Sequence, residues 1–552
     1  GSLSWILTMI RSGIKYPFGY GYWGPNGHDG IWHIALSNSL SRGSLENPVF
    51  SGEILKNYHL GFDIILAFLH KLTSIQISIL YFQVLPVIFS LLVGILVYKY
   101  VCLWRESKNE ALWATFFVYF GCGFGFIVTF LRDGIFTGES MFWSQQSFST
   151  LVNPPFALSL IFVLSGLIFL LKYLKDPSIK YYLLAIIIFG LLIQIKAYAA
   201  ILILGGLFFA SIYTFLKSKN FSIFKVLLGS LFLNLFLYLL FKSDGVTNVF
   251  VWQPFWFLET LMSYSDRFGW ERFYSAMTTY RMGELWLKAS LSYGIAFIIF
   301  LIGNMGLRVV GFLLFIKIFK NKIKINGFLV LMVSMVFIAV LIPMFFVQNG
   351  TPWNTIQFFY YYLFFFSIFA GISISWLVEK SKPLIKTVST LLILIFMVLG
   401  AWSTLQHYLP KLPQSMVSNK EYDALSFLAS KPIGVVLTYP FDKYKAREAE
   451  NFPPRPLYLY DSTAYVSAFT NKPVFLEDEV NLNIMGYRWK DRLLEIENWY
   501  KEKDQVKARD FLKINNITYV YWLKGQRAFF GEGQLGLTKI FENSTVDIFQ
   551  VE

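Results

Sequence analysis

The chain has 552 residues, of which 55% are hydrophobic and 19% aromatic, while only 15% are charged. This composition is too apolar for a soluble multidomain protein and indicates a polytopic membrane protein. The net charge of +14 could indicate nucleic acid or a membrane surface as a partner. From residue 413 onward, however, 18 Lys and Arg stand against 19 Asp and Glu. The positive excess therefore belongs to the membrane part, and no nucleic-acid partner is expected.

The start of the chain and its cysteines give two further limits. Cys102 and Cys122 fall at different predicted depths, so neither a disulfide framework nor a cysteine zinc site is expected. The apolar stretch Leu3 to Ile10 is about half of the roughly 20 residues that a bilayer-crossing helix needs. We expect a first span that is cut short at its start, and no cleavable signal peptide.

The first polar segment, Tyr20 to His33, reads YGYWGPNGHDGIWH. Asp29 lies directly after His28, and His33 follows four residues later. A carboxylate that can accept a proton, flanked by imidazoles and indoles, suits catalysis on a polar substrate such as a sugar. The alternative is a tight turn whose His and Trp side chains lie at the depth of the lipid headgroups.

A second cluster follows in Asn47 to Leu72, where polar and apolar residues alternate around His59. This pattern predicts a helix that lies along the membrane surface. His28, His33 and His59 could be zinc or manganese ligands, but no spacing matches a strong metal motif such as HExxH. The favoured interpretation is that they form hydrogen bonds to Asp29 or to the substrate. A divalent metal, Mg²⁺ or Mn²⁺, is a possible cofactor.

Ten long apolar runs predict membrane-spanning helices. They cover residues 75–100, 110–131, 153–172, 181–194, 197–216, 221–241, 289–316, 326–347, 356–377 and 384–404. With the shortened first span, the prediction is about eleven crossings.

Sixteen cations in alternating loops predict the orientation of these spans. They are Lys99, Arg105, Lys108, Lys172, Lys175, Lys180, Lys217, Lys219, Lys225, Lys317, Lys320, Lys322, Lys324, Lys380, Lys382 and Lys386. We expect these loops on the cytoplasmic side of a bacterial or archaeal membrane. Asp29 and the residues after His407 then lie on the extracytoplasmic side.

Lys196 separates two short apolar runs, and one span there instead of two would invert everything after it. The basic loops before and after favour two spans. An ionisable residue at this depth is costly and normally faces a polar cavity, so Lys196 is a candidate to bind a phosphate. The alternative is a position at a helix end. Arg308 is a weaker candidate of the same kind.

Three outer loops carry further candidate residues. Asp133, Glu139, Trp143, Gln146 and Asn153 could position an acceptor, and the acids could help Asp29 hold a divalent cation; alternatively, Asp133 marks a helix end. Arg267, Arg272 and Arg281 could bind a phosphate with their guanidinium groups, or reach the interface as snorkelling side chains. Asn354 and Gln357 could close a cavity over substrate, or belong to an aromatic belt.

The tail, residues 413–552, shows the patterning of a small α/β domain that follows a membrane domain at 1–412. Helices are expected at 421–428 and 492–512, and strands at 434–438, 517–523 and 545–551. Asp461 and the acids Glu477 to Glu479 could contact substrate, but the favoured interpretation is that they lie in solvated loops.

In layout, the chain resembles the GT-C superfamily of integral-membrane glycosyltransferases, which includes protein O-mannosyltransferases, aminoarabinose transferases and oligosaccharyltransferases. The resemblance consists of an acid in the first outer loop (Asp29), a surface helix after it, about eleven spans and an outer C-terminal domain. In detail, the segments GPNGHDGIWHIAL, ENPVFSGEILKNYHLGFD and FWSQQSFSTLVNPPFALSL look like those of a bacterial branch.

The resemblance implies a hexosyl- or pentosyltransferase whose donor is a sugar on a polyprenyl phosphate. Asp29 would be the general base that deprotonates an acceptor hydroxyl, and the product would have inverted anomeric configuration. The acceptor would be a glycan, a lipid or a protein. The chain lacks the WWD motif of oligosaccharyltransferases and has a lone Asp29 where O-mannosyltransferases have an Asp-Glu pair, so neither family's acceptor is carried over.

Two rival functions stay open. A transporter or flippase of lipid-linked glycans would be expected to show inverted repeats or broken helices, and the sequence shows no repeat. A non-catalytic membrane scaffold would recruit partners through its tail. Both rivals tolerate loss of the Asp29 carboxylate, whereas the transferase does not.

Overall fold

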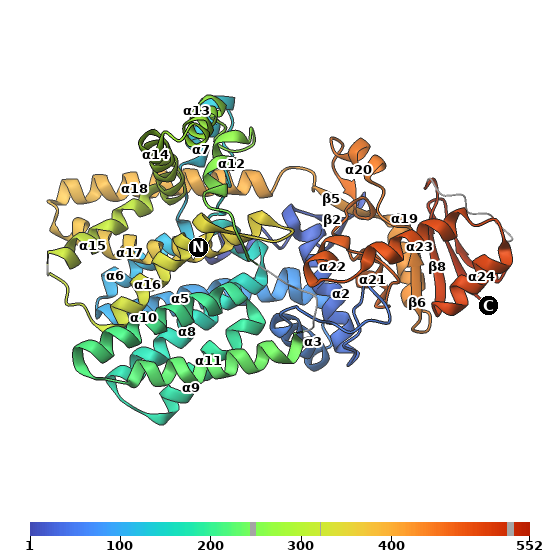
Figure 1. Ribbon diagram of the computed structural model, residues 1–552, viewed down its shortest axis with the longest axis horizontal. Coiled ribbons are helices and arrows are strands. Elements are labelled where there is room, and N and C mark those ends of the chain that lie inside the picture. The colour runs from blue at the N-terminus through green and yellow to red at the C-terminus, as the bar shows by residue number, and fades with distance from the viewer. Residues whose placement is uncertain (243–249, 321, 527–534) are drawn as a thin grey trace. The chain divides into compact units, whose positions relative to one another are not determined.

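The computed structural model describes residues 1–242, 250–320, 322–526 and 535–552, and most of them are helical (Figure 1). The chain separates into two compact units. Unit 1 contains Gly1–Thr8, Pro86–Leu240 and Thr247–Tyr408, and unit 2 contains Met9–Leu85, Phe241–Val246 and Leu409–Glu552. The sequence predicts one boundary at residue 412, whereas here the first outer loop shares a unit with the tail. The reason is a strand pairing, described below, between segments almost 400 residues apart.

Helices make up the membrane part of the chain. In order they are α5 (Leu85–Arg105), α6 (Lys108–Phe120), α7 (Gly125–Asp133), α8 (Pro154–Lys175), α9 (Ile179–Ile195), α10 (Ala197–Ser218), α11 (Ser222–Phe241), α12 (Trp256–Ser263), α13 (Glu271–Met282), α14 (Trp286–Met305), α15 (Phe312–Phe319), α16 (Gly327–Phe345), α17 (Ile356–Lys380) and α18 (Pro383–Tyr408). Short 3₁₀ turns η3 (Ser147–Val152), η4 (Gly306–Gly311) and η5 (Pro352–Thr355) connect some of them, and β3 (Phe250–Trp252) pairs with β4 (Phe346–Gln348).

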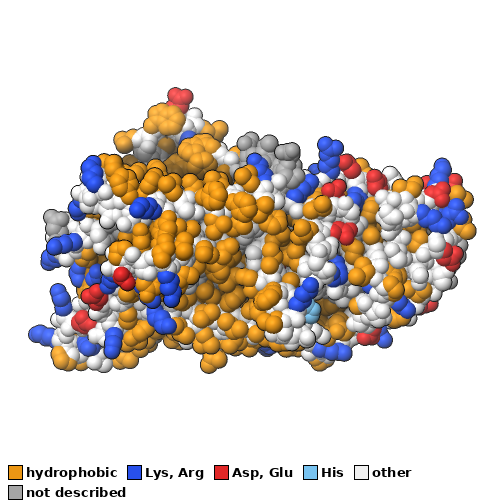
Figure 2. Space-filling model, turned by 90° about the horizontal axis from the view of Figure 1, so that it is seen from below, with side chains coloured by type: hydrophobic (Ala, Val, Ile, Leu, Met, Phe, Trp, Pro, Cys, Tyr) orange, Lys and Arg blue, Asp and Glu red, His pale blue; other side chains and the backbone are white. Residues whose placement is uncertain are grey.

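Within the described residues, nine helices are long and apolar enough to cross a membrane, and Ile179–Ile195 is a shorter apolar helix. Together they match the ten apolar runs of the sequence, and α9 and α10 are two helices on either side of Lys196. The chain is an integral multi-pass membrane protein. At the predicted first span there is only α1 (Ser2–Ile6), because turns follow it. Figure 2 shows a broad hydrophobic surface on one face of the molecule. Phe232 and Leu239 of α11 are among the exposed apolar residues.

The α17 helix lies in the core of unit 1. In its apolar stretch 89% of the residues are buried, compared with 17% in the apolar stretch of α18. It packs closely on α6 through Phe117, Ala370 and Ile374. Gly371 permits this contact, because a Cβ atom there would lie 2.3 Å from the backbone nitrogen of Ala114. Small residues at helix contacts let backbones approach in the same way in other membrane proteins.

Unit 2 contains two four-stranded sheets. The first has the order β1 (Ile14–Tyr16), β2 (Gly19–Tyr22), β5 (Ser415–Ser418), β7 (Arg455–Pro456), with β2 and β5 antiparallel and Gly19 opposite Ser418. The second has the order β6 (Val435–Thr438), β8 (Ile517–Leu523), β10 (Val546–Val551), β9 (Leu537–Glu542), with β6 and β8 parallel. Its helices are α2 (Asp29–Ser41), α3 (Gly61–Thr73), α4 (Ile77–Ile79), α19 (Asn419–Ala429), α20 (Lys443–Ala449), α21 (Tyr465–Thr470), α22 (Glu479–Met485), α23 (Trp489–Lys501) and α24 (Gln505–Ile514).

The α/β prediction for the tail is confirmed, with two corrections in unit 2. The helix expected over 492–512 is two helices, because Asp504 caps the start of α24. The surface helix expected over 47–72 is helical only from Gly61. Asn57 has a φ of +55°, which is incompatible with a helix, and Glu46 forms a β-bridge with Ile54. On α3 itself, Ile64, Phe68 and Leu72 form an exposed apolar stripe.

The close contact of α6 and α17 predicts that Gly371→Ala destabilises unit 1 by about 1–3 kcal/mol, because the new methyl group overlaps the α6 backbone. Thermal unfolding of the purified protein, followed by intrinsic fluorescence, measures the change. Gly294→Ala is the matched control, since this helical glycine has nothing within 4 Å of its Cβ position. Equal melting temperatures for both variants would contradict the packing described here.

Candidate functional site

Asp29 is the first residue of α2, directly after the 3₁₀ turn η1 (Gly24–Gly27). The strand β2 leads into this turn, and pairing of β2 with β5 fixes where the turn begins. The Ser12 hydroxyl accepts hydrogen bonds from the backbone of Trp23 and from the side-chain amide of Asn26, at 3.0 Å each. A carboxylate in the first turn of a helix is favoured by the helix dipole. The Asp29 side chain is 48% exposed, so a substrate can reach it.

Two glycines beside Asp29 are required by close packing. A Cβ atom on Gly27 would lie 2.0 Å from the Ser415 hydroxyl of β5. One on Gly30 would lie 2.8 Å from the Phe82 ring. The glycines of the NGHDG segment thus let the start of α2 sit directly against its neighbours in unit 2.

His28 is the immediate partner of Asp29. Its Nδ1 lies 3.1 Å from Oδ1 of Asp29, and its ring faces that of Tyr460 at 6.2 Å. Burial by itself would lower the pKa of the His28 imidazole, but the hydrogen bond and charge of Asp29, with Asp478 and Asp461, raise it overall. A protonated His28 favours the ionised form of Asp29.

His33 lies one turn further along α2, and its partner is Asp63 of α3. The His33 Nδ1 atom is 2.8 Å from Oδ1 of Asp63, which also accepts a hydrogen bond from the Ser37 hydroxyl at 3.2 Å. Asp63 is fully buried, and its Oδ2 has no hydrogen-bond partner. The Tyr81 ring stacks on His33 at 5.9 Å. His33 therefore supports the helix that begins at Asp29, and the structure does not bring it into contact with that carboxylate.

The remaining histidine of the prediction, His59, packs on Tyr58 with 4.5 Å between ring centres. Tyr58 in turn contacts Trp32 of α2 edge to face, at 5.5 Å. Burial and the charges of Asp63 and Asp29 raise the pKa of the Tyr58 hydroxyl well above its ordinary value. Both aromatic side chains thus border the polar region around α2.

The tail brings acids to this site, contrary to the expectation of solvated loops for Glu477 to Glu479. Asp478 is 3% exposed, caps α22, and interacts electrostatically with both His28 and Asp29. Burial raises its pKa to about 6. Glu477 is buried and accepts hydrogen bonds from the backbone of Val466 and Ser467, and burial raises its pKa to about 8. Asp461 alone of this group is exposed, as expected.

In unit 1 a buried network holds Glu139 and Gln146. Glu139 accepts hydrogen bonds from the Gln146 backbone and from the Thr404 hydroxyl, both at 2.7 Å. The Gln146 side-chain oxygen accepts from Arg308 at 2.8 Å, and Arg308 is only 1% exposed. Beside them is a cavity of about 20 Å³, enough for one water molecule. Glu139 and Gln146 thus hold the 139–150 loop on the helices.

Trp143 and Arg267 form a second assembly in unit 1. The Arg267 guanidinium lies over the Trp143 ring, 4.2 Å from its centre, and Trp256 and Tyr264 surround the same indole. The Nε of Arg267 and the Nε1 of Trp143 are buried donors without a hydrogen-bond partner. Trp143 also has a φ of +77°, a strained value for a bulky residue. Two unpartnered donors side by side suit an anionic or oxygen-rich ligand.

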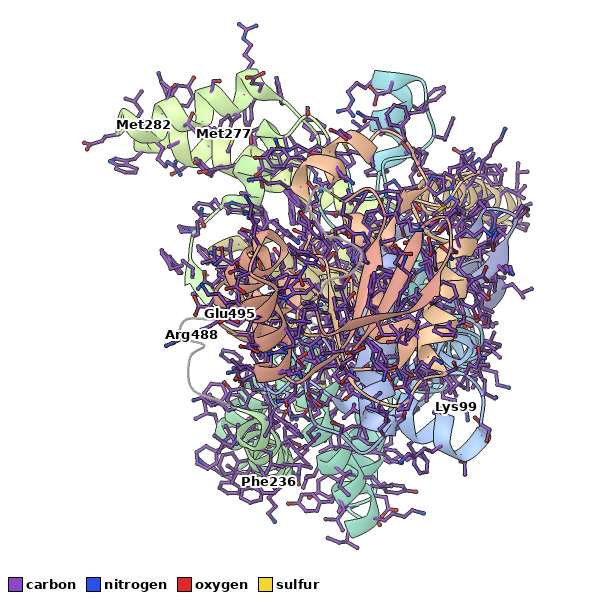
Figure 3. All side chains as sticks on the ribbon, turned by 90° about the vertical axis from the view of Figure 1, so that its right-hand side faces the viewer. Lys99, Phe236, Met277, Met282, Arg488 and Glu495 are labelled. Carbon is purple, nitrogen blue, oxygen red and sulfur yellow. The ribbon has the colours of Figure 1, made fainter. Side chains whose placement is uncertain are left out.

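The other residues predicted for unit 1 are spread over several places. Lys196 is 5% exposed, lies between α9 and α10, and is 5.6 Å from the centre of the Tyr198 ring. Arg281 forms an ion pair with Glu259, and Arg272 is exposed on α13, the helix on which Figure 3 labels Met277 and Met282.

Three of the remaining residues have local structural roles, and a fourth is placed on a helix. Asp133 pairs with Arg132 at the end of α7. Asn153 caps α8 by accepting a hydrogen bond from the backbone N–H of Phe156. Asn354 of η5 donates a hydrogen bond from its side-chain amide to the hydroxyl of Thr351. Gln357 lies partly buried on α17. The helix-end interpretation of Asp133 is thus the one that fits.

The residues in the described part of the chain include no group of three or more His, Cys, Asp or Glu placed to hold a metal ion. A divalent cation stays a prediction of the sequence.

Several functional neighbours escaped sequence reasoning. Asp63 stands 30 residues from His33, and Asp478 about 450 residues from His28. Within Asn57 to Asp63, the sequence carried a polar cluster around Asp63 but no sign of its partner. The one signal for Asp478 was its place among three successive acids in an otherwise mixed tail.

Comparisons with known proteins bear on the fold. No protein-family model and no curated protein sequence matches the chain. The oligosaccharyltransferase of Archaeoglobus fulgidus, solved with a tethered acceptor peptide, is 13% identical over 95% of this chain and 68% of its own, with a TM-score of 0.50. A mutant of the mycobacterial arabinofuranosyltransferase AftD is 12% identical over 100% of this chain and 41% of its own, with a TM-score of 0.53. At this identity the likeness is one of fold, and it is the GT-C fold that the sequence predicts.

The buried acids make stability depend on pH. Burial, with Asp461 and Asp478 nearby, raises the pKa of Glu479 to about 7. The folded state then binds a proton that the unfolded state has lost, so stability falls as pH rises from about 4.5 to 7. We expect Glu479→Gln to melt about 2 °C above the unmodified protein at pH 8 and equally at pH 4, in thermal unfolding scans.

The control for this prediction is Glu495→Gln, an exposed acid on α23 that Figure 3 labels. It should shift the melting temperature equally at both pH values. A Glu479→Gln variant with the same small shift at pH 4 and pH 8 would show that this carboxyl titrates normally.

Proposed function

We propose that this chain, which has the GT-C fold, transfers a sugar from a polyprenyl-phosphate donor to an acceptor hydroxyl. The observation that carries the proposal is Asp29, a half-exposed carboxylate at the start of α2 whose Oδ1 is bonded to His28. The fold likeness to an oligosaccharyltransferase and an arabinofuranosyltransferase supports a glycosyltransferase in general. The sugar is a hexose or a pentose, and the acceptor is a glycan, a lipid or a protein.

Asp29 acts as the general base in this proposal. Its carboxylate takes the proton of the acceptor hydroxyl while the acceptor oxygen forms a bond to the anomeric carbon. The bond from that carbon to the phosphate oxygen breaks, and the polyprenyl phosphate leaves with the electron pair. Because the acceptor attacks from the face opposite the leaving group, the anomeric configuration inverts.

His28 orients the base and favours its ionised form. The imidazole forms a hydrogen bond with Oδ1 of Asp29, so it holds the carboxylate in one rotamer. Its raised pKa means that it carries a positive charge over a wider pH range than an exposed histidine. One turn along α2 from Asp29, His33 pairs with Asp63 of α3. This pair keeps the start of α2 rigid, which a positioned base requires.

The departing phosphate needs a cation, and Arg267 is the best candidate among the predicted arginines. Arg281 is neutralised by Glu259, and Arg272 points to solvent. Arg267 is held over Trp143 and keeps a buried Nε donor without a partner. Its own ion pair, to Asp266 at 3.4 Å, involves a carboxylate that is 68% exposed and is therefore weak. Lys196 is the second candidate.

The chemistry is proposed to take place on the extracytoplasmic side of the membrane. Sixteen cations of alternating loops favour the cytoplasm for the opposite ends of the helices. Donors built on polyprenyl phosphates reside in the bilayer, which suits a catalyst made mainly of membrane helices.

Asp29→Asn should abolish transfer, lowering the rate about 10²–10⁴-fold, because the amide cannot accept the proton. In the assay, the purified protein in nanodiscs is incubated with a panel of polyprenyl-phosphate hexoses and pentoses. Pooled sugar and peptide acceptors are added. Mass spectrometry then follows the polyprenyl phosphate released and the glycosylated product.

Asp133→Asn is the matched control, since this exposed acid pairs with Arg132 at the end of α7, and its loss should leave the rate unchanged. Liposomes separate the rival functions. If the unmodified protein and Asp29→Asn both move an intact donor across the bilayer without release of phosphate, the chain is a transporter. If no polyprenyl phosphate is released and no donor crosses the bilayer, the result favours a non-catalytic scaffold.

Arg267→Gln should weaken binding of the donor about 10- to 100-fold, because it removes a charge-assisted hydrogen bond to the phosphate. The KM for the donor should rise while the rate at saturation changes less. Arg272→Gln removes the same charge from an exposed position and serves as control. Equal KM values for the two variants would exclude Arg267 from the donor site.

A further inference from the structure

A second cluster of interacting side chains lies in unit 1, at the helix ends that carry the basic loops. Trp376, near the end of α17, donates a hydrogen bond from its indole nitrogen to Glu110 at 2.7 Å. The other oxygen of Glu110 accepts from Arg105 at 2.9 Å. Lys317 of α15 places its ammonium 3.0 Å from the centre of the indole ring. We name Arg105, Glu110, Lys317 and Trp376 the Trp376 cluster.

The Trp376 cluster carries more positive charge than its carboxylate can balance. Lys380, Arg105 and Lys322 lie close enough to Lys317 to repel it, while Glu110 attracts it. Glu110 is already bonded to both Arg105 and the indole. Within the described part of the chain, Lys317 and the exposed Lys380 enter no ion pair with an acid. Their ammonium groups therefore keep N–H donors that can bind an anionic ligand.

The indole gives the cluster its geometry. An ammonium over a Trp ring is held by cation–π attraction, so Lys317 is fixed near one position and does not sweep through solvent. The Arg105 guanidinium lies over the same ring, 5.8 Å from its centre. Two cations fixed on one indole make a local anion site that a scatter of mobile lysines would not.

Exposed apolar side chains occur at the same helix ends. Phe319 of α15 is 83% exposed, Leu377 of α17 is 48% exposed, and Leu384 at the start of α18 is 76% exposed. In Figure 2, Lys and Arg side chains likewise border the broad hydrophobic surface. Lys99, labelled in Figure 3, adds a further exposed cation on α5. A ligand for this place has an anionic head and apolar chains.

We propose that the Trp376 cluster binds the headgroup phosphate of an anionic phospholipid. The phosphate would accept hydrogen bonds from Lys317 of the cluster and from the neighbouring Lys380, and the acyl chains would lie against exposed apolar residues of these helix ends. Basic pockets between membrane helices bind such headgroups where the leaflet is negatively charged. The sequence predicts this end of the helices on the cytoplasmic side. The proposal uses none of the groups assigned to sugar transfer and does not depend on that function.

The test measures lipid retention by native mass spectrometry. The purified full chain is titrated in detergent with phosphatidylglycerol and, separately, with phosphatidylcholine of the same acyl chains. We expect phosphatidylglycerol to bind more tightly. Lys317→Gln with Lys380→Gln should weaken it about 25-fold, at about fivefold for each lysine near a headgroup.

Lys180→Gln with Lys225→Gln is the matched control, because it removes the same charge from exposed lysines outside the Trp376 cluster. If both double variants bind phosphatidylglycerol equally, the site is refuted. Equal binding of the two lipids would show that no headgroup is recognised, and displacement by inorganic phosphate at the same concentration would show a free-anion site. Should the double variant not fold, exposed Lys380→Gln alone should still show the fivefold loss.

Discussion

Asp63 is the buried carboxylate on which the candidate active site depends. It is fully enclosed, and it binds two residues of α2, His33 and Ser37, which lie one and two turns after Asp29 on the same face of that helix. A buried charge is costly unless it is paired, so the contacts of His33 and Ser37 with Oδ1 of Asp63 hold α3 and α2 together. The start of α2, and with it Asp29, takes its position from this contact and from the β2–β5 pairing.

The acids of the chain stand in two kinds of surroundings. Asp29 is half exposed and carries a histidine at one oxygen, whereas Glu139 is buried and fully engaged in holding a loop. Arg308, buried among neutral acceptors, serves the same loop. Polar groups inside a helical membrane unit are expensive, so their concentration near residues 139–150 indicates that the shape of this loop matters to the protein.

The sequence could predict what local patterns decide. Apolar runs identified the ten membrane helices, and alternation with turn residues identified strands such as Ile517–Leu523. Asp29 was selected because an acid, imidazoles and glycines adjoin it in the chain. Partners far apart in sequence could not be found this way: Asp63 for His33, Arg308 for Gln146, or Asp478 near His28. The helix expected before Gly61 failed because one residue, Asn57, adopts a left-handed backbone that hydrophobic periodicity does not report.

The most direct test of the central claim is a density map of the protein with a polyprenyl-phosphate sugar bound. The anomeric carbon of the sugar should face the Asp29 carboxylate. A lipid bound only at the opposite ends of the helices, or an Asp29 carboxylate closed off from the sugar, would contradict it.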